Sequence, residues 1–230
     1  MQLFLSGGGD SDKSFEYDKK FIEAIDTTKP VLYIPIAMPQ ETHSYGDCLK
    51  WVKNNFKPFS FDNFVMWTEE DLKIKKIEDF KQFGGIYIGG GNTFKLLKEL
   101  KEFGTVEILI ELAKQNIPIF GGSAGAIIWG KTICTAIGYD DNEVRLSDFS
   151  AFNKVFGYEI WCHYLIESEK SKVIEYMSKY KLKKVIVMPD DAGIIVRESS
   201  IEFVGPAASW IFDEEGVREI KAGSVINVVA

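Results

Sequence analysis

The sequence predicts an α/β fold in which a doubly wound, mostly parallel sheet is followed by an antiparallel C-terminal extension. Short apolar segments alternate with longer amphipathic ones as far as Trp129, which is the pattern of repeated strand–helix units. The apolar segments are rich in isoleucine and valine with few alternating polar residues, as in parallel strands buried on both faces. Beyond Asp140 the spacing changes to short strands separated by turns, which indicates antiparallel pairing.

The first strands are apolar stretches that lead into helices. QLFLS (2–6) precedes a glycine-rich loop, VLYIPIA (31–37) comes next, and FVMW (64–67) follows. Between them, apolar residues recur at the helical period over 15–25 and 45–55. The order strand, helix, strand, helix, strand predicts consecutive units of one parallel sheet.

Two more strand–helix units carry the glycine-rich turns of the chain. GIYIGG (85–90) is followed by helices at 93–100 and 106–115. IPIF (117–120) leads through a Gly-Ser turn into a helix at 124–129. Because the carboxyl ends of parallel strands meet at one edge of a sheet, both glycine turns are expected at that edge.

The second part of the chain has one helix among several short strands. The helix is expected at 168–180. The strand candidates are EIWCHYLI (159–166), KVIVMP (184–189), GIIVRE (193–198), IEFVG (201–205), SWIFDE (209–214) and VREIKAG (217–223).

Composition limits the class of protein and its partners. With 230 residues, 46% of them apolar, the chain is long enough for a single domain over 1–230. A formal net charge of −7 argues against nucleic acid or an anionic membrane as a partner. The three cysteines form no C-x-x-C pair, and the first ten residues lack the pattern of a signal peptide. No apolar run reaches the roughly 18 residues of a membrane span, so we expect a reduced, cytoplasmic protein.

The segment NIPIFGGSAGAIIWG (116–130) holds the candidate nucleophile. Its centre, Gly121-Gly122-Ser123-Ala124-Gly125, matches the G-x-S-x-G pattern of a nucleophile elbow. A strand that turns directly into a helix forces the serine into a sharp bend, so its neighbours must be small. The serine Oγ then lies above the sheet edge, near the positive end of the helix. A plain turn with serine as the N-cap has a similar composition, so the hypothesis needs a base.

The chain has only two histidines to serve as that base. His163, in EIWCHYLIE, follows an apolar strand and precedes a polar turn, which suits a residue at a strand end. His43, in ETHSYGD, lies among polar residues at a helix start, where a solvated surface histidine is expected. We therefore predict His163 as the general base for Ser123. Two histidines so far apart give no metal-ligand spacing, and neither metal nor cofactor is expected.

An acid must orient the imidazole, and two pairs of aspartates compete for that role. Asp190 and Asp191, in VIVMPDDAGIIV, lie between two strand candidates. Asp140 and Asp141, in GYDDNEV, are their rivals, and either pair could consist of plain turn residues. In the α/β-hydrolases the acid precedes the histidine in the chain. Asp190 and Asp191 follow His163, so either of them would give a different order.

Two backbone amides are needed to stabilise an oxyanion. The residue after the nucleophile, Ala124, supplies one candidate. The glycine run of YIGGGNTFKLL (87–97) supplies another, since it joins a strand to a helix. That run lacks the spacing of both common phosphate-binding patterns, which favours the oxyanion interpretation.

These motifs together resemble one family of serine peptidases. IYIGGGNTFKLLKEL, GGSAGA, the histidine of CHY, VIVMPDDAGIIV and VGPAASWIFDEEGVREIKAG occur in the order found in the family of dipeptidase E and cyanophycinase. The resemblance extends over nearly the whole chain. It implies a flavodoxin-like fold similar to class I glutamine amidotransferases, with a serine where those enzymes have a cysteine.

The resemblance also implies residue roles and an activity. It assigns the nucleophile to Ser123, the base to His163, the acid to Asp190, and the oxyanion donors to Gly90 and Ala124. The family's acid is usually a glutamate. The implied activity is hydrolysis of small peptides through an acyl-enzyme, as in the aspartyl dipeptidases.

Some positions depart from the family pattern. Trp161 and Cys162 precede His163 where the family shows Asn-Pro, and no arginine follows closely. Only three arginines occur in the chain, although a guanidinium is the group that best binds a substrate aspartate. The alternative is a catalytically silent member that binds a small ligand or a partner. Hydrolysis of cyanophycin would need a groove for a polymer, and no insertion for one is evident.

Overall fold

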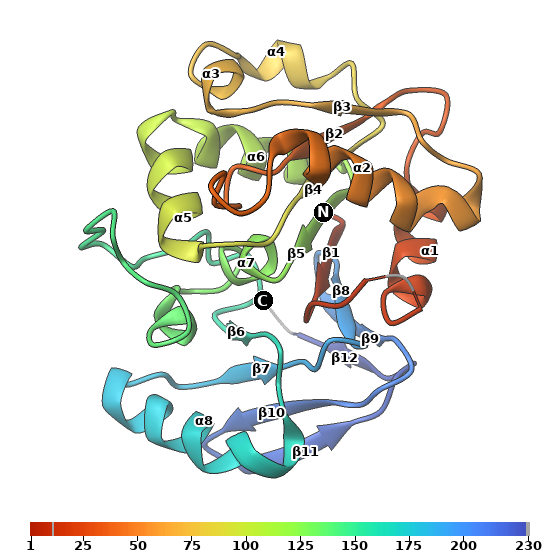
Figure 1. Ribbon diagram of the computed structural model, residues 1–230. Coiled ribbons are helices and arrows are strands. Elements are labelled where there is room, and N and C mark those ends of the chain that lie inside the picture. The colour runs from red at the N-terminus through yellow and green to blue at the C-terminus, as the bar shows by residue number, and fades with distance from the viewer. Residues whose placement is uncertain (11, 229–230) are drawn as a thin grey trace.

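A large sheet of eight strands forms the centre of the molecule, and a smaller sheet of four strands lies beside it (Figure 1). The computed structural model describes residues 1–10 and 12–228. In the large sheet five neighbouring strands are parallel: β1 (Leu3–Ser6), β5 (Ile119–Gly122), β4 (Gly85–Ile88), β2 (Val31–Ile34) and β3 (Phe64–Met66). Three antiparallel strands extend it from β1: β8 (Gly193–Val196), β9 (Ser200–Val204) and β12 (Val225–Asn227).

Helices cover both faces of the large sheet, because successive side chains of a strand point to opposite faces. On one face, aromatic residues of the strands pack against α1 (Phe15–Ala24) and α2 (Tyr45–Phe56). On the other face, leucines and isoleucines pack against α5 (Thr93–Glu102), α6 (Thr105–Lys114) and α7 (Ala124–Ile127). Burial on both faces explains why these strands are continuous apolar runs in the sequence.

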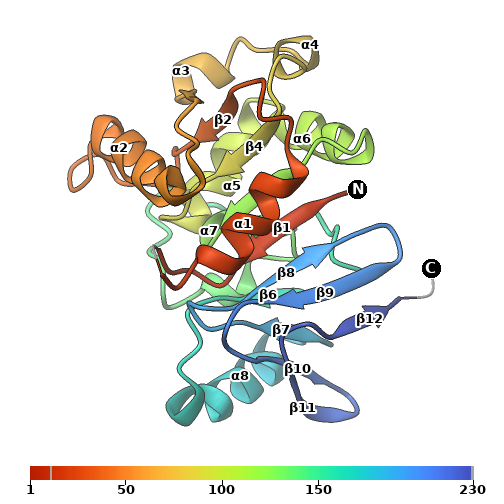
Figure 2. The same ribbon diagram turned by 90° about the vertical axis from the view of Figure 1, so that its right-hand side faces the viewer.

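The smaller sheet consists of strands from the second part of the chain. Its order is β11 (Gly216–Ile220), β10 (Ser209–Asp213), β7 (Val185–Val187) and β6 (Glu159–Trp161). Only β6 and β7 are parallel to each other. Figure 2 shows this sheet beyond β8 and β9, with α8 (Ile166–Tyr180) against it. A cluster of buried apolar side chains, among them Trp161 and Phe212, joins that helix to the sheet.

The predicted fold class is confirmed: the chain is α/β, with a large, mostly parallel sheet and antiparallel C-terminal strands. The expectation of a single extension was too simple, because its strands divide between the edge of the large sheet and a sheet of their own. The sequence pattern did not predict β12 or four short helical turns: η1 (Lys57–Phe59), α3 (Glu69–Leu72), α4 (Ile77–Phe80) and η2 (Cys134–Ala136).

Several element ends differ from those expected. The strand expected at 117–120 is displaced towards Ser123, because Gly121 and Gly122 pair with β1 instead of forming a turn. The strand expected at 31–37 already ends at Ile34. The helix expected at 168–180 begins at Ile166.

Among the described helices, none combines the length and the apolar character that crossing a membrane requires.

Candidate active site

Ser123 lies in the sharp bend between β5 and α7, with φ 50° and ψ −111°. A non-glycine residue in such a conformation is strained and persists only when its surroundings enforce it. The glycines around it are required for close approach. A Cβ built on Gly121 would lie 2.2 Å from the carbonyl oxygen of Gly125, and one built on Gly125 would lie 2.3 Å from that of Ile88. The local sequence therefore holds the serine at the sheet edge by steric constraint.

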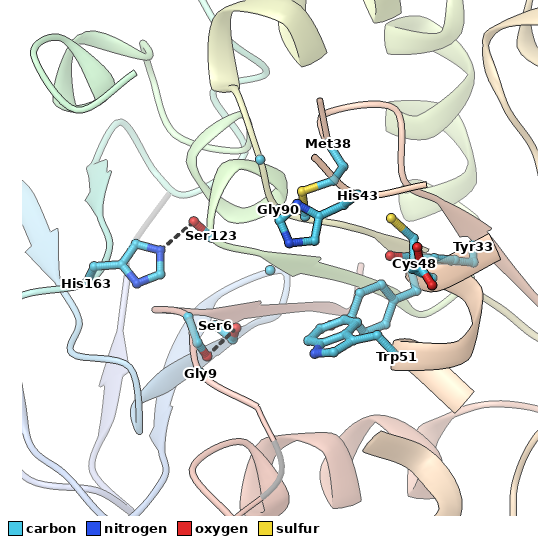
Figure 3. A pocket seen from close by; sticks show the side chains of 15 residues that line it. Ser6, Gly9, Tyr33, Met38, His43, Cys48, Trp51, Gly90, Ser123 and His163 are labelled. Atoms are coloured by element: carbon cyan, nitrogen blue, oxygen red, sulfur yellow. Dashed lines mark hydrogen bonds between the residues drawn. The ribbon is translucent and has the colours of Figure 1, made fainter. Parts of the chain in front are cut away.

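His163 lies just beyond β6 and faces this serine. Its Nε2 is 2.7 Å from Ser123 Oγ, and the two side chains point towards each other (Figure 3). The backbone of His163 has φ 56°, and its amide donates a hydrogen bond to the carbonyl oxygen of Gly7 at 2.9 Å. The structure thus brings together the predicted nucleophile and the predicted base, 40 residues apart in the chain.

Asp190 follows β7 and lies on the opposite side of the imidazole from Ser123. Its Oδ1 is 2.7 Å from His163 Nδ1, and its Oδ2 is 3.1 Å from Lys13 Nζ. Burial alone would raise the pKa of Asp190, but the hydrogen bonds from His163 and Lys13 outweigh it and hold the pKa below the ordinary value. The carboxylate is therefore charged when it faces the imidazole.

The rival aspartates have other positions. Asp191 contributes a carbonyl oxygen to the turn, which accepts from the amide of Ala207. The carboxylate of Asp140 accepts from the amide of Thr93 at 2.8 Å, at the start of α5. Asp190 is thus the member of the two pairs whose carboxylate contacts His163.

A loop of three glycines after β1 packs against both His163 and Asp190. A Cβ built on Gly8 would lie 2.3 Å from Cε1 and 2.5 Å from Nδ1 of His163, and Gly8 has φ 138°. A Cβ on Gly9 would lie 2.5 Å from the carbonyl oxygen of Asp190. Only glycine fits these positions, so the loop fixes the imidazole from the side of the large sheet.

Tyr17 of α1 ties this loop to the turn that carries Asp190. Its hydroxyl lies 2.6 Å from the carbonyl oxygen of Gly8 and 2.8 Å from that of Asp190, so it donates to this pair of acceptors. Burial raises the pKa of Tyr17, which keeps the hydroxyl protonated as a donor. The sequence analysis missed Gly8, Lys13 and Tyr17. The glycine run after the first strand was the available signal, but its partners lie more than 150 residues away.

Gly90 borders Ser123 from the end of β4. A Cβ built on Gly90 would lie 3.2 Å from Ser123 Cβ and 3.8 Å from its Oγ. Gly91, with φ 132°, passes so close to Ala37 that a Cβ there would lie 2.3 Å from its carbonyl oxygen. The two predicted oxyanion residues therefore lie beside Ser123. Gly90 follows β4, and Ala124 begins α7 after the neighbouring strand β5.

A pocket of about 520 Å³ opens beside Ser123. His43 lies on its wall, together with Trp51 and Tyr33 (Figure 3). The side chain of His43 is exposed, as expected, but its place beside the pocket was not foreseen, because it depends on how the loop before α2 folds back.

No group of three or more histidine, cysteine, aspartate or glutamate side chains within residues 1–10 and 12–228 is arranged to hold a metal ion.

Comparison with known proteins identifies the family. The model of peptidase family S51 matches residues 3–204. The chain belongs to this family. A peptidase E of Shewanella sp. strain W3-18-1 is 26% identical over 206 residues, which cover 78% of this chain and 82% of the relative. Membership confirms the predicted resemblance and the prediction of a serine peptidase, a hydrolase.

Two solved structures share the fold. The crystal structure of a peptidase from an acI-B1 Actinobacterium has a TM-score of 0.71 and 19% identity, covering 98% of this chain and 96% of that one. A Listeria monocytogenes EGD-e protein assigned to peptidase E has a TM-score of 0.68 and 22% identity, covering 90% and 98%. At this identity the likeness concerns the fold, and it fits the flavodoxin-like, glutamine amidotransferase-like architecture predicted from the sequence.

Proposed function

We propose that this peptidase hydrolyses small peptides through an acyl-enzyme formed on Ser123. The observation that carries the proposal is the continuous chain of hydrogen-bonding groups from Ser123 Oγ through both ring nitrogens of His163 to Asp190, with 2.7 Å at each step. A nucleophile, a base and an orienting acid in this arrangement define a catalytic triad, whatever their order in the chain.

The proposed first step is attack by Ser123 Oγ on the carbonyl carbon of the substrate. His163 Nε2 takes the hydroxyl proton as the new C–O bond forms. The amides of Gly90 and Ala124 stabilise the negative charge on the carbonyl oxygen of the tetrahedral intermediate. His163 then donates its proton to the leaving amine, and the C–N bond breaks to give the acyl-enzyme.

In the second step a water molecule attacks the acyl-enzyme. His163 takes one proton from the water as the new C–O bond forms. It then gives that proton to Ser123 Oγ as the C–Oγ bond breaks, and the product leaves as the carboxylic acid, which ionises in solution. Asp190 accepts a hydrogen bond from Nδ1–H throughout, so that Nε2 stays free to act as a base and the imidazolium is stabilised. The hydrogen bonds that keep Asp190 ionised, from His163 and Lys13, thereby support the cycle.

The dimensions of the site favour small peptides. The pocket beside Ser123 has a volume of about 520 Å³, within the range of about 300–1,000 Å³ typical of sites for small ligands.

We place the enzyme in the cytoplasm, since its three cysteines are unpaired and two of them, Cys48 and Cys162, are buried. Free buried thiols suit a reducing compartment.

A fluorophosphonate probe tests the proposal, because only an activated serine reacts with it. The wild-type protein should be labelled at Ser123, and Ser123→Ala should lose labelling and peptide hydrolysis with its melting temperature retained. Ser178→Ala, which alters an exposed serine on α8, is the matched control and should be labelled normally. Absence of labelling in the wild-type protein would instead favour a catalytically silent binding protein.

A further inference from the structure

The wall of the pocket beside Ser123 is aromatic and sulfur-rich. Tyr33 and Tyr87 are almost fully buried, with ring centroids 5.6 Å apart in an edge-to-face arrangement. Trp51 of α2 packs edge-to-face on Tyr87 at 6.5 Å and keeps 36% of its surface exposed. Met38 and Cys48 complete the apolar lining. These contacts hold the aromatic rings in place, so the pocket presents a preformed apolar surface.

The charged groups of this wall are unsuited to an acidic ligand. Among the described residues that line the pocket, none is lysine or arginine. Asp47 is the lining carboxylate, and it accepts a hydrogen bond from Ser44 Oγ at 2.6 Å. Asp10 adds a second carboxylate near the rim, 3.4 Å from Trp51 Nε1. A ligand carboxylate here would lose its hydration without gaining a lysine or arginine partner and would be repelled by Asp47.

Two basic side chains lie near the triad or the pocket wall, Lys13 and His43. The ammonium of Lys13 pairs with Asp190 at 3.1 Å. The imidazole of His43 lines the pocket, with Nδ1 3.0 Å from Thr42 Oγ1. His43 is therefore the basic side chain that any test of acid binding must control for.

The position of the pocket relative to the triad decides which part of a substrate enters it. The base of a serine peptidase protonates the leaving amine, so the leaving group lies next to His163. The acyl part of the substrate then extends to the other side of Ser123. Figure 3 shows His163 on one side of the serine and the aromatic wall, with Trp51 and Tyr33, on the other. The pocket reaches from His163 to this wall. Its aromatic end therefore lies on the side of the residue whose carbonyl is attacked.

We propose that this pocket selects an aromatic or large aliphatic residue on the acyl side of the scissile bond and excludes aspartate. The substrates would be small peptides with a first residue such as phenylalanine or leucine. This inference rests on the proposed function, because it assumes that Ser123 attacks the carbonyl of that residue. Trp51, Tyr33 and Tyr87 supply the apolar contact, and Asp47 supplies the repulsion.

A set of dipeptides that differ only in the first residue tests the preference. We expect kcat/KM for Phe-Leu and Leu-Leu to exceed that for Asp-Leu by more than about 100-fold at pH 8 and at pH 6. A ratio below about ten at either pH would overturn the proposal. Asp-Leu as the best substrate at pH 6 alone would overturn it by assigning specificity to His43.

Variants of the wall connect the preference to named residues. Trp51→Ala should lower kcat/KM for Phe-Leu by at least tenfold. The control is Phe15→Ala, a similarly exposed aromatic residue of α1 that packs on Phe59 outside the pocket. Asp47→Asn should raise the ratio of kcat/KM for Asp-Leu to that for Phe-Leu several-fold. Equal losses from Trp51→Ala for Phe-Leu and Asp-Leu would contradict a role in selectivity.

Binding to the Ser123→Ala variant separates this inference from the proposed function. Calorimetric titration of the variant with Phe-Leu and with Asp-Leu measures recognition without turnover. Tighter binding of Phe-Leu supports the pocket assignment even if the wild-type protein hydrolyses neither peptide. Tighter binding of Asp-Leu overturns it, even if wild-type Ser123 is labelled by the fluorophosphonate and the proposed mechanism stands.

Discussion

The first and second parts of the chain each contribute one pair of adjacent parallel strands to the candidate site. In the large sheet, β4 and β5 end shortly before Gly90 and Ser123. In the smaller sheet, β6 and β7 end near His163 and Asp190. Neighbouring parallel strands finish at a common edge, so each pair brings its two residues together without further help. The site forms where these two edges face each other.

The two parts differ in how they hold their residues. Ser123 is fixed by contacts within the first part of the chain: Gly121 packs against Gly125 in the same turn, and Gly125 packs against Ile88 of β4. His163 and Asp190 are fixed by contacts to the other part of the chain, through the loop after β1 and through Tyr17. The position of Ser123 therefore depends on the first part of the chain alone, whereas the positions of His163 and Asp190 depend on how well the two sheets fit together.

Loss of the base should have the largest effect on activity. Removing one member of a triad that acts as a unit costs on the order of 10⁴ to 10⁶ in kcat, so His163→Ala should fall in that range. His43→Ala removes a pocket wall group and should cost less than about tenfold in kcat. Steady-state kinetics measure kcat for the two variants. Equal losses of kcat would mean that His163 is not the base.

Loss of the orienting acid should come next. Asp190→Asn keeps the shape of the side chain but favours the wrong imidazole tautomer, with an expected fall in kcat of up to about 10⁴. Asp191→Asn, at the neighbouring position, should cost only a few-fold. A comparable loss in both variants would show that the turn as a whole, and not one carboxylate, supports His163.

The contact between the loop after β1 and His163 can be disturbed by a single added methyl group. Gly8→Ala places a methyl group where the His163 ring lies, and a misplacement of about 1 Å can cost about 100-fold in kcat. Gly104→Ala is the matched control, since Gly104 also has a positive φ, 69°, but has open space around its Cα. It should lower the melting temperature and leave kcat unchanged. Normal kcat in Gly8→Ala would show that the loop does not position the base.

The smallest effect on rate is expected from Asp18 of α1, a buried carboxyl group in the first part of the chain. This group should instead change the free energy of unfolding. Burial raises the pKa of Asp18 to about 7, although a hydrogen bond from Ser14 lowers it. The folded state therefore binds this proton more tightly than the unfolded state, whose pKa is about 3.9. Below pH 4 both states are protonated. Between about pH 4 and pH 7 stability falls as the pH rises, by up to about 4 kcal/mol.

Urea unfolding of Asp18→Asn against wild type measures this contribution. The two proteins should differ little at pH 4, and the variant should be the more stable one at pH 8. Asp62→Asn, at an exposed position, provides the control for the removal of one negative charge. A pH dependence of Asp18→Asn as steep as that of the wild type would contradict the assignment.

Features that depend on short-range structure were predictable. The strand–helix order followed from apolar periodicity, and Ser123 followed from the steric requirements of its turn. His163 could be selected because the chain offers a single alternative, His43. Asp190 could not be separated from Asp191 by spacing alone, since both follow the same strand, and only the resemblance to a family favoured one of them.

Features that depend on long-range contacts were not predictable. Short strands with turns between them do not specify which sheet they join, so the division of the C-terminal strands between two sheets was missed. Gly8 and Tyr17 meet partners more than 150 residues away, and no local pattern marks such a contact. The pocket wall was missed for the same reason, because Tyr33, Trp51 and Tyr87 come together from separate elements.

The central position of β1 governs when during synthesis the enzyme can become active. This strand pairs on one side with β5 and on the other with β8, where Leu3 lies opposite Val196. A nascent chain that has emerged only as far as Ser123 holds the proposed nucleophile without the proposed base, His163. Because such distant pairing slows folding, activity should appear late. On refolding from urea, fluorophosphonate labelling should therefore develop only with the slowest change in tryptophan fluorescence, after most of the helix signal has returned.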